Sequence, residues 1–195
     1  WRDRLTDVSL EVGKGEIVGL GGLEGQGQRD LLLALFGVLR GLDGEIRIDG
    51  RPVRLTSPAG AKDKRVGMAL IPEDRKTEGL MLPMTIGENI GMAAMGSLTS
   101  GPFVDTAKEK AAVAAMVDKL RIKIGSVDDP VATLSGGNQQ KVVIAKWLLT
   151  GPRLILLNDP TRGIDVGTKQ EIYQLLRKLA DAGAAIVFYS TDYDE

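Results

Sequence analysis

Apolar residues along this chain form short aliphatic runs and longer stretches with helical spacing, separated by glycine-rich or polar turns. Aliphatic runs at 16–20, 66–71, 154–157 and 185–189 predict strands that are buried on both faces. Helical patterns between these runs imply crossover connections, which are right-handed in nearly all proteins. The pattern therefore predicts an α/β fold built on a doubly wound parallel sheet.

Two regions depart from this simple alternation. Residues 45–50 and 53–55 alternate in polarity around an Asp-Gly pair, which predicts an antiparallel hairpin. From about residue 84 to residue 149 the spacing becomes helical, and Val113, Met116, Val117 and Leu120 share one apolar helix face, best explained by core packing. We expect one domain over 1–195, with 1–81 and 151–195 forming the core and 82–150 a helical subdomain.

Composition narrows the functions open to the chain. Its 195 residues include 25 basic and 26 acidic side chains, a net charge of −1, which disfavours a nucleic-acid partner. The sequence contains no cysteine and no histidine, so disulfides, thiolate metal sites and a histidine base are excluded. Because the sequence starts at Trp1 without Met and stops after a strand-like segment, we expect a fragment of a longer polypeptide.

A glycine-rich turn follows the first predicted strand, and its spacing is that of a phosphate-binding loop. The P-loop pattern G-x-x-x-x-G-K-[ST] cradles phosphates with backbone N–H groups, while its Lys reaches phosphate and its hydroxyl binds Mg²⁺. Gly22 and Gly27 match the pattern, and Gly25 adds flexibility. The Lys position holds Gln28 and the Ser/Thr position holds Arg29. Neither side chain can replace the original contact.

A second pair of motifs lies downstream. Residues 134–142 read LSGGNQQKV, and residues 154–161 read LILLNDPT. Adjacent glycines at a helix start expose N–H groups to an anion, and a buried strand delivers polar side chains to its carboxyl end. Together these motifs resemble the signature and Walker B strand of ABC-type ATPases, with the glycine turn upstream as a degenerate Walker A. The intact signature positions are Ser135, Gly136, Gly137 and Gln139.

The resemblance implies that the chain has lost catalytic residues selectively. Asn158 and Asp159 stand where the family ends its Walker B strand in Asp-Glu. Glu73 aligns with the family's Q-loop glutamine and Thr191 with its switch histidine, whereas the D-loop aspartate is kept at Asp165. We therefore expect no intact catalytic residue in cis, no metal at this site, and weak ATP binding or none.

The family works as a head-to-tail dimer in which each ATP lies between the Walker motifs of one domain and the signature of the other. The resemblance implies that this chain donates its signature in trans, while ATP and Mg²⁺ are bound at the partner's site. The alternative is that the LSGG run survives only as a helix start.

A subfamily also follows from the motifs. Residues 72–80 (PEDRKTEGL) and 159–167 (DPTRGIDVG) resemble the second ATPase half of tandem bacterial importers of ribose, xylose or galactose. That resemblance implies a second ABC domain upstream in the same polypeptide, permease subunits, an indirect periplasmic or extracellular sugar-binding protein, and a peripheral location on the cytoplasmic face of the membrane. A non-transport ABC ATPase of DNA repair or translation and a nucleotide-independent scaffold remain the alternatives.

Overall fold

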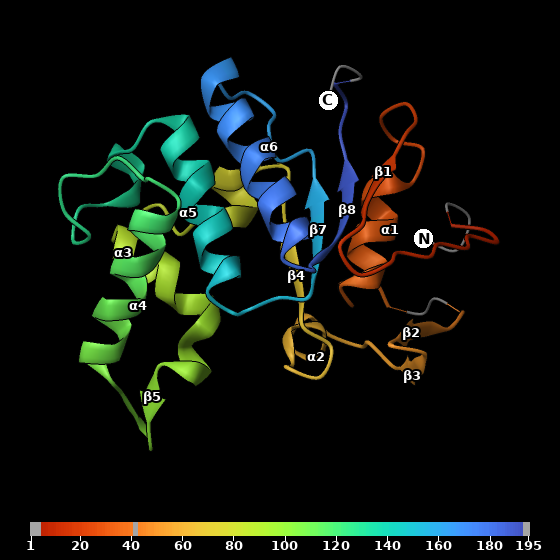
Figure 1. The fold of residues 1–195 in the computed structure, drawn as a ribbon, viewed down its shortest axis with the longest axis horizontal. Helices are drawn as coiled ribbons and strands as arrows, with labels where there is room; N and C mark the ends of the chain where they lie inside the picture. Colours follow the sequence, from red (N-terminus) through yellow and green to blue (C-terminus); the bar gives the residue numbers. More distant parts are fainter. Residues whose placement is uncertain (1–4, 41–42, 193–195) are drawn as a thin grey trace. The chain divides into compact units, whose positions relative to one another are not determined.

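The computed structural model describes residues 5–40 and 43–192, which form two compact units (Figure 1). The sheet unit takes the chain up to Leu70, together with Pro152–Pro160 and the chain from Gln174 onward. The helical unit takes Ile71–Gly151 and Thr161–Tyr173. Each unit is therefore assembled from segments that are separated in the sequence.

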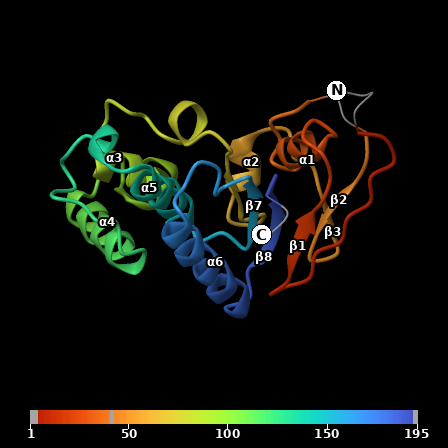
Figure 2. The ribbon, with the colours of Figure 1, turned by 90° about the horizontal axis from the view of Figure 1, so that it is seen from above.

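A four-stranded sheet forms the centre of the sheet unit, and its strand order is β1-β8-β7-β4. Figure 2 shows three of these strands, β1, β8 and β7, beside one another. The strands are β1 (Ile17–Leu20), β4 (Met68–Ile71), β7 (Leu154–Asn158) and β8 (Ala185–Tyr189). β8 pairs in parallel with both β1 and β7, which confirms the parallel sheet predicted from the aliphatic runs. The prediction that the first strand is buried on both faces was wrong, because the residues of β1 are exposed or half-buried and Ile17 is 44% exposed. In this register Leu20 and Asn158 both lie beside Tyr189, so three strands end at the same edge.

The remaining elements of the sheet unit follow local rules. Helix α1 (Gln28–Leu35) packs against β7, and α2 (Pro58–Lys62) begins at Ser57, whose hydroxyl accepts the Gly60 N–H. β2 (Ile46–Ile48) and β3 (Arg51–Val53) form the expected hairpin. Asp49 and Gly50 both have positive φ, which is the conformation that the two-residue turn of a twisted hairpin requires.

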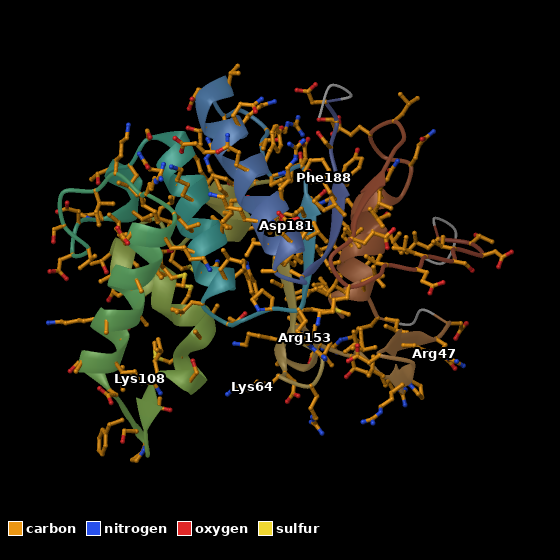
Figure 3. All side chains as sticks on the ribbon, in the orientation of Figure 1. Arg47, Lys64, Lys108, Arg153, Asp181 and Phe188 are labelled. Atoms are coloured by element: carbon orange, nitrogen blue, oxygen red, sulfur yellow. The ribbon has the colours of Figure 1, made fainter. Side chains whose placement is uncertain are left out.

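Arg153 ties this hairpin to the sheet (Figure 3). Its guanidinium pairs with the Asp49 carboxylate at 2.7 Å and donates to the carbonyl of Arg65. Arg153 directly precedes β7, so its guanidinium links the hairpin turn to the start of a strand of the sheet.

The helical unit is built mainly from three packed helices, α3 (Ile86–Gly91), α4 (Thr106–Lys119) and α5 (Gly136–Leu148). Local signals fix where they start: Thr85 and Glu88 form a capping box at α3, and Asp105 caps α4. The shorter elements of this unit are a π-helix η1 (Arg75–Gly79), 3₁₀ helices η2 (Met92–Ser97) and η3 (Val131–Thr133), and strands β5 (Thr99–Ser100) and β6 (Phe103–Val104).

The hairpin of β5 and β6 was not expected, because the sequence pattern indicated helix throughout this region.

Helix α6 (Val166–Asp181) starts in the helical unit and ends in the sheet unit. No helix in the described ranges is both long enough and apolar enough to cross a bilayer.

Candidate phosphate loop and signature

The glycine-rich loop between β1 and α1 is the candidate phosphate loop. Gly22, Gly25 and Gly27 all have positive φ, a conformation that side chains with a Cβ seldom adopt. Gly27 precedes the first turn of α1, and it has no side chain with which to cap the helix. The loop therefore leads directly into a helix N-terminus, where the first backbone N–H groups have no partner within the helix.

Two glutamines of the loop fold back onto its own backbone. The Gln26 Oε1 accepts the Leu23 N–H at 2.9 Å, and the Gln28 Nε2 donates to the Gly21 carbonyl at 3.2 Å. Both side-chain amides lie against Gly22, where an added Cβ would collide with them. Gln28, which occupies the lysine position, is thus turned toward its own loop. These contacts could not be predicted from the sequence.

Asn158 and Asp159 lie at the carboxyl end of β7 and are almost fully buried, with 3% and 2% of their surface exposed. The Asp159 N–H donates to the Tyr189 carbonyl at 2.8 Å, and Asp159 has a φ of 44°, which is uncommon for a residue other than glycine. The Oδ1 of Asn158 is buried and accepts no hydrogen bond from the described residues.

The structure brings Asp159 and Thr191 together. The Thr191 hydroxyl donates to the Asp159 carboxylate at 2.6 Å. From the sequence we expected these two residues at the positions of the family's catalytic glutamate and switch histidine, and they lie 32 residues apart in the chain. Asp159 is thereby linked by a side-chain hydrogen bond to a residue just beyond the end of β8.

The chemistry of these side chains does not suit Mg²⁺. A hard divalent cation takes carboxylate, carbonyl or hydroxyl oxygens. Arg29 offers a cation in place of the hydroxyl, and Asn158 offers one neutral oxygen in place of a carboxylate. No cluster of three or more acidic residues that could hold a metal ion occurs in the described part of the chain.

In the helical unit, Glu73 is held by an ion pair with Arg162. The next residue, Asp74, caps η1 by accepting the Lys76 N–H at 2.8 Å and the Thr77 N–H at 3.3 Å. The side-chain hydrogen bond from Thr77, followed by the Lys76 N–H, keeps the pKa of the Asp74 carboxyl below its usual value. The charged segment is therefore a structured element rather than a freely solvated loop.

The signature begins α5 and has an exposed serine. The Ser135 Oγ accepts the Asn138 side-chain amide at 3.1 Å and the Asn138 N–H at 3.5 Å, which makes Ser135 the helix cap. With two donors directed at this oxygen, the hydroxyl proton is left to donate elsewhere. Gln139, by contrast, is 5% exposed and donates to the Val131 carbonyl at 3.4 Å, so its side chain faces the interior.

Asp165, which we expected to be the D-loop aspartate, directly precedes helix α6. Asp165 accepts both the N–H and the hydroxyl of Thr168 at 2.9 Å, and these hydrogen bonds, the backbone one first, lower the pKa of the Asp165 carboxyl. Thr168 in turn lies against Gly137, where an added Cβ would be 2.7 Å from the Thr168 Oγ1. Arg75 lies similarly against Gly136. Sequence reasoning gave no separate role to Arg75 or Thr168.

Comparison with known proteins decides the family. The family described as "ABC transporter" matches residues 5–162. The chain belongs to the ABC transporter family. This ABC domain is 69% identical over 195 residues to the ribose import ATP-binding protein RbsA 1 of Mesorhizobium japonicum, covering 100% of the chain and 38% of that protein. It is 46% identical over 190 residues to RbsA 2 of Streptomyces avermitilis, covering 97% and 37%.

The chain thus spans little more than a third of the length of these relatives. Among solved structures, a dimeric ATP-binding cassette in a post-hydrolysis state bound to ADP and Pi superposes with a TM-score of 0.81 at 25% identity. That match covers 98% of this ABC domain and 81% of the solved chain, and it confirms the α/β P-loop fold with a helical subdomain.

Proposed function

We propose that this chain is the ATP-binding domain of a bacterial ABC importer for a sugar, and that it resembles the second, degenerate half of a tandem ATPase. In this function it donates its signature to the ATP site of another ABC domain. The observation that carries the proposal is a contrast between two groups of residues. The signature helix keeps an exposed Ser135 with a proton to donate, whereas Gln28, Arg29 and Asn158 replace groups that bind phosphate and Mg²⁺.

The domain's own site supports only weak nucleotide binding. The backbone of the glycine loop retains its anion-binding form, but Gln26 and Gln28 already occupy part of its hydrogen-bonding capacity. The Mg²⁺ ligands are replaced, and Asp159 is bonded to Thr191. We therefore assign ATP hydrolysis to the partner's site, where ATP and Mg²⁺ are bound by the partner's own residues.

The donated groups are an exposed hydroxyl and the N-terminus of a 13-residue helix. Backbone N–H groups and the helix dipole favour negative charge at this end, so the helix can stabilise the γ-phosphate of a nucleotide held by the partner. Ser135, Gly136 and the D-loop residue Asp165 belong to this surface. Gln139 supports it from the interior, since its side chain is buried.

Cargo and partners are inferred from relatives whose names describe ribose import. We assign a sugar, with ribose the first to test, and the partners expected of such an importer: a second ABC domain, transmembrane permease subunits and a sugar-binding protein. The domain would then act at the cytoplasmic face of the membrane.

The decisive experiment uses the full-length protein with its permease in proteoliposomes. Ser135→Arg should lower ATPase activity and sugar uptake by about 100-fold or more, because it removes the donor hydroxyl and fills the space that the partner's γ-phosphate should occupy. Ser100→Arg, the same change at an exposed residue of β5, is the matched control and should leave both activities intact. Gly136→Asp is less suitable, because its carboxylate would meet Arg75 within the same chain.

Gln28→Ala provides the opposite arm of the test. We expect a much smaller effect than that of Ser135→Arg, since Gln28 bonds to its own loop. If Gln28→Ala abolished transport while Ser135→Arg was tolerated, the roles would be reversed and the domain would act through its own nucleotide site.

A nucleotide-independent scaffold is the second candidate, and the inward-turned glutamines favour it. Calorimetry separates the two. Absence of binding at millimolar ATP would support the scaffold, whereas weak binding with little dependence on Mg²⁺ would support the degenerate site.

A further inference from the structure

The Arg75 guanidinium connects two segments that lie far from it in the sequence. Its Nη1 donates to the Arg162 carbonyl at 3.3 Å, and its Nη2 would lie 2.8 Å from a Cβ added to Gly136. Its Nε is buried and has no hydrogen-bond partner within the described residues. The side chain is therefore packed between the loop after β7 and the first residue of the signature helix.

Arg162 is held a second time from the same loop. The Glu73 carboxylate pairs with the Arg162 guanidinium, while Arg75 bonds to the Arg162 main chain. All three residues belong to the helical unit. The segment 73–75 thus fixes both the backbone and the side chain of residue 162.

The two signature glycines have different neighbours within this chain. Gly136 makes room for Arg75, and Gly137 makes room for Thr168, whose Oγ1 would lie 2.7 Å from an added Cβ. Thr168 is bonded to Asp165 at 2.9 Å. The glycines therefore admit two separate contacts, one to the charged loop and one to the D-loop.

We propose that Arg75 is a positioning residue for the signature, which fixes the start of α5 against the loop at 161–165, and that residue 136 is glycine in order to admit its guanidinium. The inference rests on the proposed function, because the positioned surface is the one offered to a partner domain. The inference gives Gly136 a role within its own chain, whereas its conventional role would concern only the partner's nucleotide.

The physical consequence is a coupling between Arg75 and Gly136. An Ala at residue 136 can be accommodated if the end of the Arg75 side chain moves, because that end is flexible. Moving it breaks the bond to the Arg162 carbonyl and releases the loop. Arg75→Ala loses the same bond directly, so the two substitutions should not add.

A double-mutant cycle in the full-length protein tests this inference by steady-state ATPase kinetics. Gly136→Ala and Arg75→Ala should each lower kcat by about fivefold, with the KM for ATP within about twofold, because Arg75 acts on the helix and not on the nucleotide. The double variant should be no slower than the slower single variant.

Two controls accompany the cycle. Gly137→Ala collides with Thr168 instead, so its effect should add to that of Arg75→Ala, giving about a 25-fold loss if each costs about fivefold. Lys76→Ala removes a neighbouring exposed cation and should leave kcat unchanged. Hydrogen exchange provides a readout independent of activity: amides at 161–165 should exchange faster in Arg75→Ala and in Gly136→Ala, and at the wild-type rate in Lys76→Ala.

Additive losses for Gly136→Ala and Arg75→Ala, or a Gly136→Ala variant with wild-type kinetics and exchange, would overturn the inference. Failure of the proposed function gives a different pattern, in which Ser135→Arg is tolerated. The two outcomes can therefore be read separately from one set of proteins.

Discussion

Restoring the lysine of the phosphate loop should restore nucleotide affinity without restoring hydrolysis. In Gln28→Lys, the hydrogen bond from Gln28 to the Gly21 carbonyl is lost, and an ammonium gains access to phosphate. Gly21 is exposed, so water can replace the lost donor and the cost is small. A charge-assisted bond to phosphate contributes about 1.5–3 kcal/mol. After the cost of the lost bond, we expect a net gain of about 1–2 kcal/mol, or about 5- to 30-fold tighter binding.

Isothermal calorimetry on the purified chain, with ATP in the presence of Mg²⁺ or of a chelator, measures this gain. The chelator should change the affinity little, because Arg29 and Asn158 still stand at the Mg²⁺ positions. Gln28→Met is the matched control: it removes the amide from the loop without adding charge, and should change the Kd by no more than about threefold. Circular dichroism and the melting temperature check that each variant is folded.

Two results would refute this reasoning. If Gln28→Lys bound ATP no better than the wild type, the loop would be closed by something other than the missing ammonium. If Gln28→Met tightened binding as much as Gln28→Lys, the self-bonded amide would be the whole obstacle, and the lysine contact would contribute nothing.

Two further predictions concern stability, each measured by urea denaturation. Thr191→Val should lower the free energy of unfolding by about 1–3 kcal/mol, because the buried Asp159 carboxylate loses its hydroxyl donor, whereas Thr191→Ser should retain most of it; equal stability of the valine and serine variants would contradict this. Burial lowers the pKa of Lys146 from 10.5 to about 8, so between these values the unfolded chain binds more protons than the folded one. The free energy of unfolding should therefore rise between about pH 8 and pH 10.5 by a contribution that the Lys146→Met variant lacks. An equal change in the stability of the wild type and the variant between about pH 7.5 and pH 9.5 would count against this prediction.

Features set by neighbouring residues could be predicted from the sequence. The turn at Asp49-Gly50 specifies the β2–β3 hairpin because its two residues tolerate positive φ. The aliphatic runs predicted parallel strands, and β4 and β7 are buried as such runs indicate. The burial of β1 could not be predicted in this way, because its residues are exposed or half-buried although the run is apolar. The β5–β6 hairpin was missed, since two residues per strand are too few to show an alternating pattern.

The contacts that define the candidate sites depend on side chains brought together by the fold. Asp159 meets Thr191 because β7 and β8 are adjacent and end in register, and Arg75 meets Gly136 through the packing of η1 against α5. Alignment to family motifs identified Asp159, Thr191 and Gly136, but motif spacing carries no information about which of these positions touch one another. The inward orientation of the Gln28 side chain depends on the conformation of a single loop. It therefore has no counterpart in the periodic pattern of apolar residues along the sequence.

The place of β8 in the sheet has a consequence for how the protein is made. Ile17 of β1 pairs with Ile186 of β8, so β1 leaves the ribosome long before its partner is synthesised. β8 also separates β1 from β7, so β1 has no neighbour in this sheet until β8 is made, whereas β7 lies beside β4. The helical unit consists mainly of the continuous segment Ile71–Gly151 and can pack earlier. The pairing of β1 therefore waits for β8, and until then its exposed edge must be kept from pairing with other chains.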